Sequence, residues 1–186
     1  MQYIIGADEV GYGAWAGPLV VCGVRADPKW VIPGLNDSKK LSEKKRDQLS
    51  SILLSLTEIS YVLVSKENTE IDNLGLGVCL KQAYQEVASK LLTADSTMVI
   101  DGTVKLVRPD PRVSCLIKAD QKVPTVMAAS IIAKVYRDGL MRKFAIQYPM
   151  YDWENNVGYG GAQKHRDGIK KHGLCVLHRH SYKMKL

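Results

Sequence analysis

The hydrophobic positions of this chain fall into short apolar runs that are separated by segments with helical spacing. Residues 18–25 are almost entirely apolar, which is typical of a strand buried on both faces. Residues 58–64 alternate between apolar and polar positions, as in a half-buried strand. In all, five strands are predicted, over residues 2–8, 18–25, 58–64, 97–101 and 113–118.

Between these runs, the apolar residues recur every three or four positions. Leu49, Leu53 and Leu56 share one helical face, and Ser42 is a suitable N-cap for that helix. Pro124 suits the first turn of another helix. The predicted helices cover residues 42–57, 78–92, 124–147 and 162–172.

Two segments are less regular. Residues 68–76 are predicted to be a polar connection or a short helix, and residues 149–161 to be a loop. Because strands alternate with helices along most of the chain, the expected fold is α/β, with a mixed central sheet flanked by helices.

Composition narrows the class of protein. The 186 residues suffice for one domain, with or without a small extension, and 46% hydrophobic with 24% charged residues is usual for soluble globular proteins. The net charge of +7 favours a polyanionic partner. No apolar stretch is long enough to span a membrane, and the chain enters its first strand without a signal peptide.

The four cysteines are widely spaced and form no Cys-x-x-Cys pair, so a reduced, cytosolic protein is expected. Cys22, Cys79 and Cys115 lie in apolar contexts and are predicted to be core residues. The four histidines all fall in the last 22 residues, but their spacing fits no standard zinc pattern.

Acidic residues stand where several predicted strands end. Asp8 and Glu9 close the first strand, Asp101 closes the strand over 97–101, and Asp120 follows the next strand. Strand ends can converge at one edge of an α/β sheet, and clustered carboxylates repel one another unless cations neutralise them. Oxygen ligands suit Mg²⁺ or Mn²⁺, and two such ions can activate a water and stabilise a leaving oxygen. With nineteen acidic residues, other combinations stay open at this point.

Two patterns have competing interpretations. Asp138 is an alternative fourth carboxylate, although its helical neighbours Arg137 and Arg142 favour a structural ion pair. The glycines from Gly11 to Gly17 could be mistaken for a dinucleotide-binding loop, but their spacing is wrong and a strand follows them.

Seven ordered motifs cover nearly the whole chain. They are GADEVGYG with AGP (6–13 and 16–18), LNDSKKLS (35–42), IDG (100–102), KAD (118–120), AASIIAKVYRD (128–138), GYG (158–160) and HRHSY (178–182). Together they resemble type 2 ribonuclease H, also called ribonuclease HII. This resemblance implies a ribonuclease H-like fold with a small helical C-terminal segment.

The resemblance also implies an activity and a catalytic set. The activity is endonucleolytic cleavage of the RNA strand of RNA–DNA hybrids, and of ribonucleotides embedded in duplex DNA, by two-metal hydrolysis that leaves a 5′-phosphate and a 3′-hydroxyl. Asp120 matches the family's Lys-x-Asp position and is preferred to Asp138. The implied catalytic and metal-binding residues are Asp8, Glu9, Asp101 and Asp120.

Substrate-binding residues follow from the same motifs. The family's Gly-Arg-Gly loop and a later tyrosine read the ribose, while a Ser-Lys pair contacts phosphate. The matching positions here are Gly11, Tyr12, Gly13, Ser38, Lys39 and Tyr159. Tyr12 stands in place of the arginine, so the backbone donors survive but a guanidinium is lost. Cleavage of long hybrids is therefore expected more firmly than cleavage at single ribonucleotides.

The organisation expected is a catalytic domain over 1–148, with a loop and a basic helical extension over 149–186 packed on the same domain. The basic residues of the extension are expected to follow the nucleic-acid backbone. They are Lys164, Arg166, Lys170, Lys171, Arg179, Lys183 and Lys185. A monomeric cytoplasmic enzyme that uses Mg²⁺ or Mn²⁺ is expected.

Three alternatives remain. The first is a ribonuclease HIII-like hybrid nuclease without junction preference. The second is a different metal nuclease or strand-transfer enzyme on the same fold. The third is a non-catalytic protein that binds hybrids.

Overall fold

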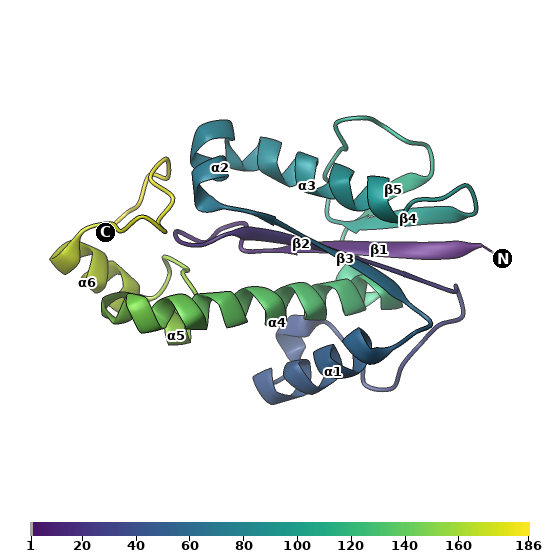
Figure 1. Ribbon diagram of the computed structural model, residues 1–186, viewed down its shortest axis with the longest axis horizontal. Coiled ribbons are helices and arrows are strands. Elements are labelled where there is room, and N and C mark those ends of the chain that lie inside the picture. Colours follow the sequence, from purple (N-terminus) through teal and green to yellow (C-terminus); the bar gives the residue numbers. More distant parts are fainter. Residues whose placement is uncertain (1) are drawn as a thin grey trace.

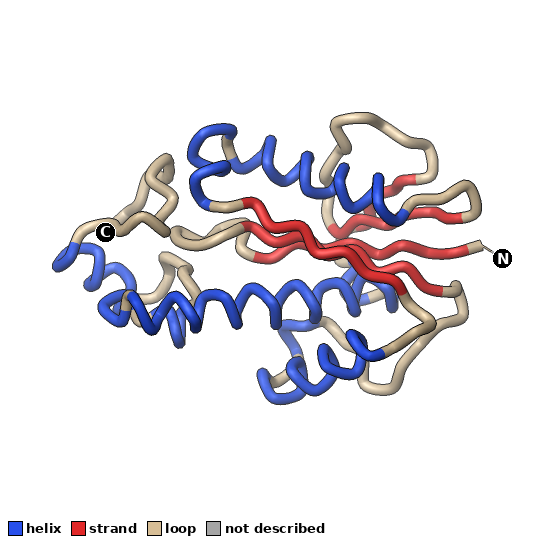
Figure 2. Tube along the Cα trace, in the orientation of Figure 1, coloured by secondary structure: helices blue, strands red, loops and turns tan. Residues whose placement is uncertain are grey.

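A mixed five-stranded sheet forms the centre of the molecule, with helices on both faces (Figures 1 and 2). The computed structural model describes residues 2–186. The strand order is β3-β2-β1-β4-β5. β1 pairs antiparallel with β2 and parallel with β4, so the sheet changes direction beside β1. The strands are β1 (Tyr3–Val10), β2 (Leu19–Ala26), β3 (Ser60–Lys66), β4 (Ser96–Asp101) and β5 (Val113–Leu116), which confirms all five predicted strands.

Helices cover the two faces of the sheet unequally. Figure 1 shows α2 and α3 on one face and α1 with the long α4 on the other, while α5 and α6 lie at the end that carries the C-terminus. Each face encloses its own apolar cluster, one under α3 and one under α1 and α4. The helices are α1 (Glu43–Ser55), α2 (Asn68–Leu74), α3 (Leu76–Leu91), α4 (Pro124–Gln147), α5 (Trp153–Asn156) and α6 (Gln163–His172).

Local signals account for the helix ends. The Ser42 hydroxyl accepts a hydrogen bond from the Lys45 amide at 3.3 Å, and Pro124 occupies the first turn of α4, both as predicted. Of the segment over 68–76, residues 68–74 form a short helix, and Gly75 at φ +84° separates it from α3, which begins at Leu76.

A close approach of α4 to β1 positions the site. A Cβ at Gly6 would lie only 2.2 Å from the Val126 backbone nitrogen, so only glycine lets the start of α4 cross β1 here. The next turns of α4 therefore run directly beside the carboxyl-terminal half of β1.

The segment over 149–161 is not simply a loop, so that prediction is wrong. It contains a 3₁₀ turn, Pro149–Tyr151, and α5. Tyr151 and Trp153 are buried and stacked with ring centroids 5.0 Å apart. They pack with Met141 of α4 and Ile169 of α6. Helical pieces of three or four residues are too short to show periodicity, so only tertiary packing reveals them.

The cysteine prediction holds in part. Cys22 and Cys79 are buried, but Cys115 is exposed on β5, so its assignment to the core is wrong. β5 is an edge strand, where apolar neighbours in sequence do not guarantee burial. Among residues 2–186, no helix combines the length and apolar character needed to cross a membrane.

Candidate active site

Three carboxylates from separate segments meet where the carboxyl ends of β1 and β4 lie side by side. Asp8, Asp101 and Asp120 each offer an oxygen, and these oxygens all lie within 4.8 Å of one another. The β1–β4 register pairs Ala7 with Ile100, which places Asp8 beside Asp101. Asp120 belongs to a 3₁₀ turn, Ala119–Gln121, that is tied to β4 because the Ala119 amide donates to Asp101 Oδ1 at 2.7 Å. The predicted convergence of these three residues is thus observed.

Glu9 lies apart from this cluster. Successive residues of a strand point to opposite faces, and the Glu9 carboxylate instead accepts a hydrogen bond from the Tyr84 hydroxyl of α3. Burial raises the pKa of Glu9, and the Tyr84 hydrogen bond opposes that rise. Tyr84 was missed from sequence; the available signal was a tyrosine hydroxyl on the buried face of a helix, which needs a polar partner.

The cluster carries more negative charge than its surroundings neutralise. Asp8 is only 6% exposed, and burial raises its pKa to about 7, assisted by the charges of Glu9 and Asp101. Burial and Asp101 also raise the pKa of Asp120. The one cation paired with the cluster in the described chain is Lys39, whose Nζ is 3.5 Å from Asp120 Oδ2. Oxygen donors with excess negative charge fit a hard divalent cation.

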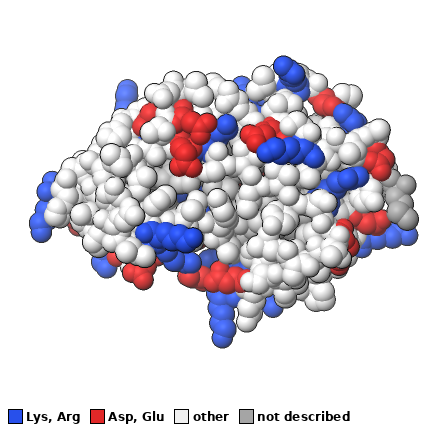
Figure 3. All heavy atoms as spheres, viewed as in Figure 1, with Lys and Arg blue, Asp and Glu red and all other residues white. Residues whose placement is uncertain are grey.

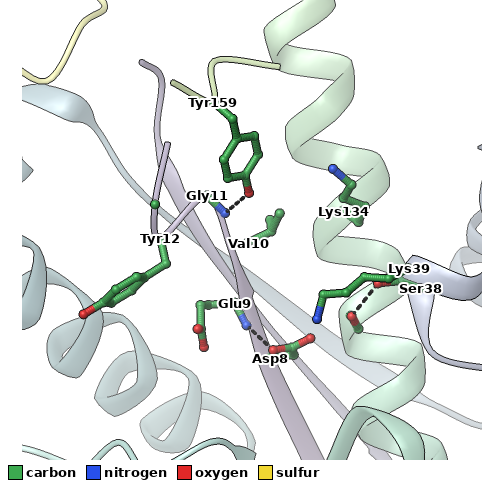
Figure 4. A pocket seen from close by; sticks show the side chains of 11 residues that line it. Asp8, Glu9, Val10, Gly11, Tyr12, Ser38, Lys39, Lys134 and Tyr159 are labelled. Carbon is green, nitrogen blue, oxygen red and sulfur yellow. Dashed lines mark hydrogen bonds between the residues drawn. The ribbon is translucent and has the colours of Figure 1, made fainter. Parts of the chain in front are cut away.

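A pocket opens beside the cluster (Figure 4). All six predicted substrate-binding residues line it, together with Asp8 and Glu9. Sequence reasoning missed two polar lining residues, Ser130 and Lys134, which lie one turn apart on α4. In Figure 4 the Tyr12 ring turns away from Asp8.

The loop before α1 forms one wall of the pocket. The Asp37 carboxylate accepts hydrogen bonds from the Lys39 amide at 2.9 Å and from Gln121 Nε2 at 3.1 Å. Ser38 is buried, and its Oγ lies 2.9 Å from Ser130 Oγ. These bonds fix the loop and leave the Lys39 side chain exposed toward the pocket.

The opposite wall joins the glycine loop to the turn that carries Tyr159. The Gly11 amide donates to the Tyr159 hydroxyl at 3.2 Å, and the Trp15 amide donates to the Gly158 carbonyl at 2.8 Å. Gly11 has φ +86°, and a Cβ there would lie 2.2 Å from Arg137 Nε. A glycine is therefore required at position 11 for both conformation and space.

A buried pair of histidines, His165 and His178, holds the turn that carries Tyr159. His165 Nδ1 lies 3.1 Å from the Tyr159 carbonyl, and its Nε2 lies 3.1 Å from both Trp153 Nε1 and His178 Nε2. The Cys175 amide donates to His178 Nδ1. With both rings neutral and protons on His165 Nδ1 and His178 Nε2, the bonds to the Tyr159 carbonyl and from the Cys175 amide both form, and the single lone pair of His165 Nε2 is shared by the Trp153 and His178 donors. Burial correspondingly lowers both pKa values, that of His178 to about 4.

Two expectations about charged residues need correction. Asp138 pairs with Lys134, at 3.0 Å, rather than with Arg137 or Arg142, because lysine at i−4 shares its helical face. Arg179 is fully buried and bonds backbone carbonyls, so it is not part of a basic surface. On the face in Figure 3, positive and negative side chains are interspersed.

The chain is similar in sequence to known proteins of one family. The family model described as Ribonuclease HII matches residues 5–185. Ribonuclease HII of Clostridium beijerinckii is 42% identical over 190 residues, covering 100% of this chain and 69% of that protein. Ribonuclease HII of Jannaschia sp. is 41% identical over 179 residues, covering 96% and 88%.

Solved structures show the same fold. Ribonuclease HII of Archaeoglobus fulgidus, in complex with PCNA, has a TM-score of 0.82 and 26% identity, covering 100% of this chain and 97% of that chain. Bst-RNase HIII in complex with Mn²⁺ has a TM-score of 0.70 and 20% identity, covering 92% and 63%, which supports the fold alone. By sequence and by fold, this chain belongs to the ribonuclease HII family and is a ribonuclease H endoribonuclease, a hydrolase of phosphodiester bonds.

Proposed function

We propose that this enzyme hydrolyses the RNA strand of RNA–DNA hybrids with two divalent ions, Mg²⁺ or Mn²⁺, held by Asp8, Glu9, Asp101 and Asp120. Ribonucleases H depend on divalent metal ions and act on RNA–DNA hybrids. The observation that carries the proposal is the group of three carboxylates within 4.8 Å, whose charge the protein itself leaves largely unbalanced.

The bound ions would supply an activated water and charge relief on the departing 3′-oxygen. The chain's own residues prepare the site for this chemistry. Asp101 accepts the Ala119 amide and so fixes the turn that presents Asp120. Tyr84 orients Glu9 from the opposite side of β1. Asp8 must lose its proton to bind metal, so we expect metal affinity to rise as the pH increases through about 7.

Substrate recognition is assigned to the two walls of the pocket. Ser38 and Lys39 on one wall are proposed to contact phosphate. Gly11, Tyr12 and Gly13, with Tyr159, are proposed to read the ribose on the other. Because the Tyr12 ring supplies no cation, long hybrids should be cut better than single ribonucleotides in DNA. The enzyme is expected to act as a monomer in the cytoplasm.

A substrate panel tests this function. Four duplexes of one sequence are compared with each metal: an all-RNA strand opposite DNA, a single ribonucleotide in DNA, plain DNA, and plain RNA. Cleavage confined to the first two duplexes, with 5′-phosphate products, supports the proposal. Cutting of plain DNA with hybrids untouched would favour a different metal nuclease. Tight hybrid binding without cleavage under either metal would favour the non-catalytic alternative.

A further inference from the structure

We infer that Arg179, supported by Arg137, is a positioning residue that turns the backbone N–H groups of Tyr12 and Gly13 into a receptor for an oxygen of the ribonucleotide. This inference rests on the proposed function of the glycine loop as the ribose-reading wall. The buried guanidinium of Arg179 then sets the conformation of the glycine loop and strengthens its N–H groups as hydrogen-bond donors.

Arg179 donates most of its N–H groups to the glycine loop, which spans residues 11–17, and to Tyr182. Its Nη2 donates to the Gly11 carbonyl at 2.7 Å, and its Nη1 donates to the Tyr12 carbonyl at 3.0 Å. Its Nε donates to the Gly17 carbonyl at 3.1 Å. The Tyr182 hydroxyl accepts from Arg179 at 2.9 Å and itself donates to the Tyr12 carbonyl at 3.2 Å.

The carbonyls of Gly11 and Tyr12 belong to the peptide units that carry the proposed donors. The Gly11 carbonyl shares its unit with the Tyr12 N–H, and the Tyr12 carbonyl shares its unit with the Gly13 N–H. In a trans peptide the C=O and N–H point in opposite directions, so both N–H groups point away from Arg179. Within residues 2–186, neither N–H donates to a backbone or side-chain acceptor. Both residues line the pocket that holds Asp8.

Backbone carbonyls, rather than paired carboxylates, accept the hydrogen bonds of the two arginines that lie against the loop. Arg137 and Arg179 are both fully buried, and neither forms an ion pair within the described chain. Arg137 completes the frame by donating to the carbonyls of Ala16, Pro18 and Val157 at 2.8 to 2.9 Å, which joins the glycine loop to the Tyr159 turn. A guanidinium bonded to a carbonyl polarises its peptide unit and strengthens the N–H at the other end.

This arrangement bears on the replacement of the family's arginine by Tyr12. Position 12 presents no cationic side chain, yet positive charge still reaches the loop surface through two polarised peptide units. The Tyr12 side chain can vary without disturbing that receptor, because the bonds to Arg179 involve only its backbone.

The test measures discrimination rather than activity alone. Binding of a duplex with one ribonucleotide and of the all-DNA duplex of the same sequence is measured with Ca²⁺ in place of the active metal. The variants are Arg179→Lys, which keeps charge but cannot span three carbonyls, and Tyr182→Phe, which removes one hydroxyl from the network. Leu53→Ala, in the apolar cluster under α1 and α4 and without a bond to the glycine loop, is the control for lost stability.

We expect Arg179→Lys to lose about tenfold in the affinity ratio between the two duplexes, and Tyr182→Phe to lose about threefold. The amide proton resonances of Tyr12 and Gly13 should move upfield in both variants, because the polarising bond is weakened. Leu53→Ala should lower stability while leaving the ratio and these resonances unchanged.

The outcomes separate two failures. A wild-type enzyme that binds both duplexes equally would overturn the proposed ribose-reading function itself. A wild-type enzyme that discriminates, with ratios and amide shifts unchanged in the variants, would overturn the role of Arg179 alone. If Arg179→Lys does not fold, Tyr182→Phe decides the matter, since its hydroxyl is partly exposed and its loss should be tolerated.

Discussion

One cluster of charge lies at the carboxyl end of β1 and another lies against the loop that follows it, and the two are satisfied in opposite ways. The acidic cluster of Asp8, Asp101 and Asp120 has one lysine against three carboxylates. The basic pair, Arg137 and Arg179, has no carboxylate within ion-pair distance in the described chain, but six backbone carbonyls accept its hydrogen bonds.

The difference distinguishes the acidic cluster, which we propose as a binding site, from the arginine pair, which holds the backbone around it. Charges that the protein leaves unbalanced favour an external partner, whereas charges saturated by carbonyls fix the backbone. Neutralising a residue of the first cluster should therefore reduce activity at little cost in stability. Removing a residue of the second should reduce stability directly.

The largest expected effect is on catalysis. Asp101→Asn should lower the cleavage rate by at least about a thousandfold while leaving duplex affinity largely intact, because it removes charge from the metal site and no phosphate contact. The amide oxygen of asparagine can still accept the Ala119 amide. Single-turnover cleavage and duplex binding measure the two effects. Asp95→Asn, at an exposed ion pair, is the control and should change neither; near-wild-type turnover in Asp101→Asn would refute the assignment.

A large stability effect is expected at the basic pair. Arg137→Met leaves three carbonyls, two of them buried, without their donor and should reduce the free energy of unfolding by about 3 to 5 kcal/mol. Arg142→Met, five residues further along α4, loses only a partly exposed ion pair with Glu43 and should cost less than about 1 kcal/mol. Urea denaturation compares them. Equal denaturation midpoints for Arg137→Met and Arg142→Met would show that the hydrogen bonds of Arg137 do not stabilise the glycine loop.

The acidic cluster should make the metal-free protein less stable as pH rises. The pKa of Asp8 is raised from 3.8 to about 7 in the folded state, so its contribution is full below pH 3.8 and is lost as pH rises to about 7. The loss is at most about 4 kcal/mol. The lowered pKa of His178 acts the other way, since its contribution is lost as pH falls from 6.5 to about 4.

The informative quantity is therefore the difference between wild type and Asp8→Asn. The variant should gain stability relative to wild type between pH 4 and 7, and added Mg²⁺ should stabilise wild type alone. Thermal unfolding in buffers across this range provides the measurement. Parallel curves for the two proteins would mean that the Asp8 carboxyl is not held at raised pKa.

The smallest effect concerns the exposed ring of Tyr12. Tyr12→Arg should raise cutting at a lone ribonucleotide relative to a long hybrid by about fivefold, because a guanidinium can contact phosphate. Tyr61→Arg, at an exposed tyrosine on β3, controls for added charge. An unchanged ratio would show that side-chain chemistry at position 12 is irrelevant to this choice.

Much of the fold could be predicted because its signals are local. The strands, the Ser42 cap and the Pro124 start of α4 depend on alternation and on capping chemistry within a few residues. The short helices over 149–156 could not be predicted, since they depend on Trp153 packing against α4 and α6. Exposure of Cys115 depends on the position of β5 in the sheet order, which no local pattern encodes.

The site divides in the same manner. The convergence of Asp8, Asp101 and Asp120 was predicted from strand ends and family motifs, and the β1–β4 pairing with the following 3₁₀ turn brings them together. Arg179 was misassigned to the surface because sequence does not distinguish a solvated arginine from one that donates to three backbone carbonyls in the interior. Tyr84 was missed because its partner, Glu9, is 75 positions away in sequence.

The metal site is the central claim, and Mn²⁺ located by anomalous diffraction tests it most directly. Crystals grown with Mn²⁺ should show an anomalous peak about 2.1 Å from oxygens of Asp8, Asp101 and Asp120, and Asp101→Asn crystals should lose it. A peak elsewhere on the molecule, or none at millimolar Mn²⁺, would contradict the account.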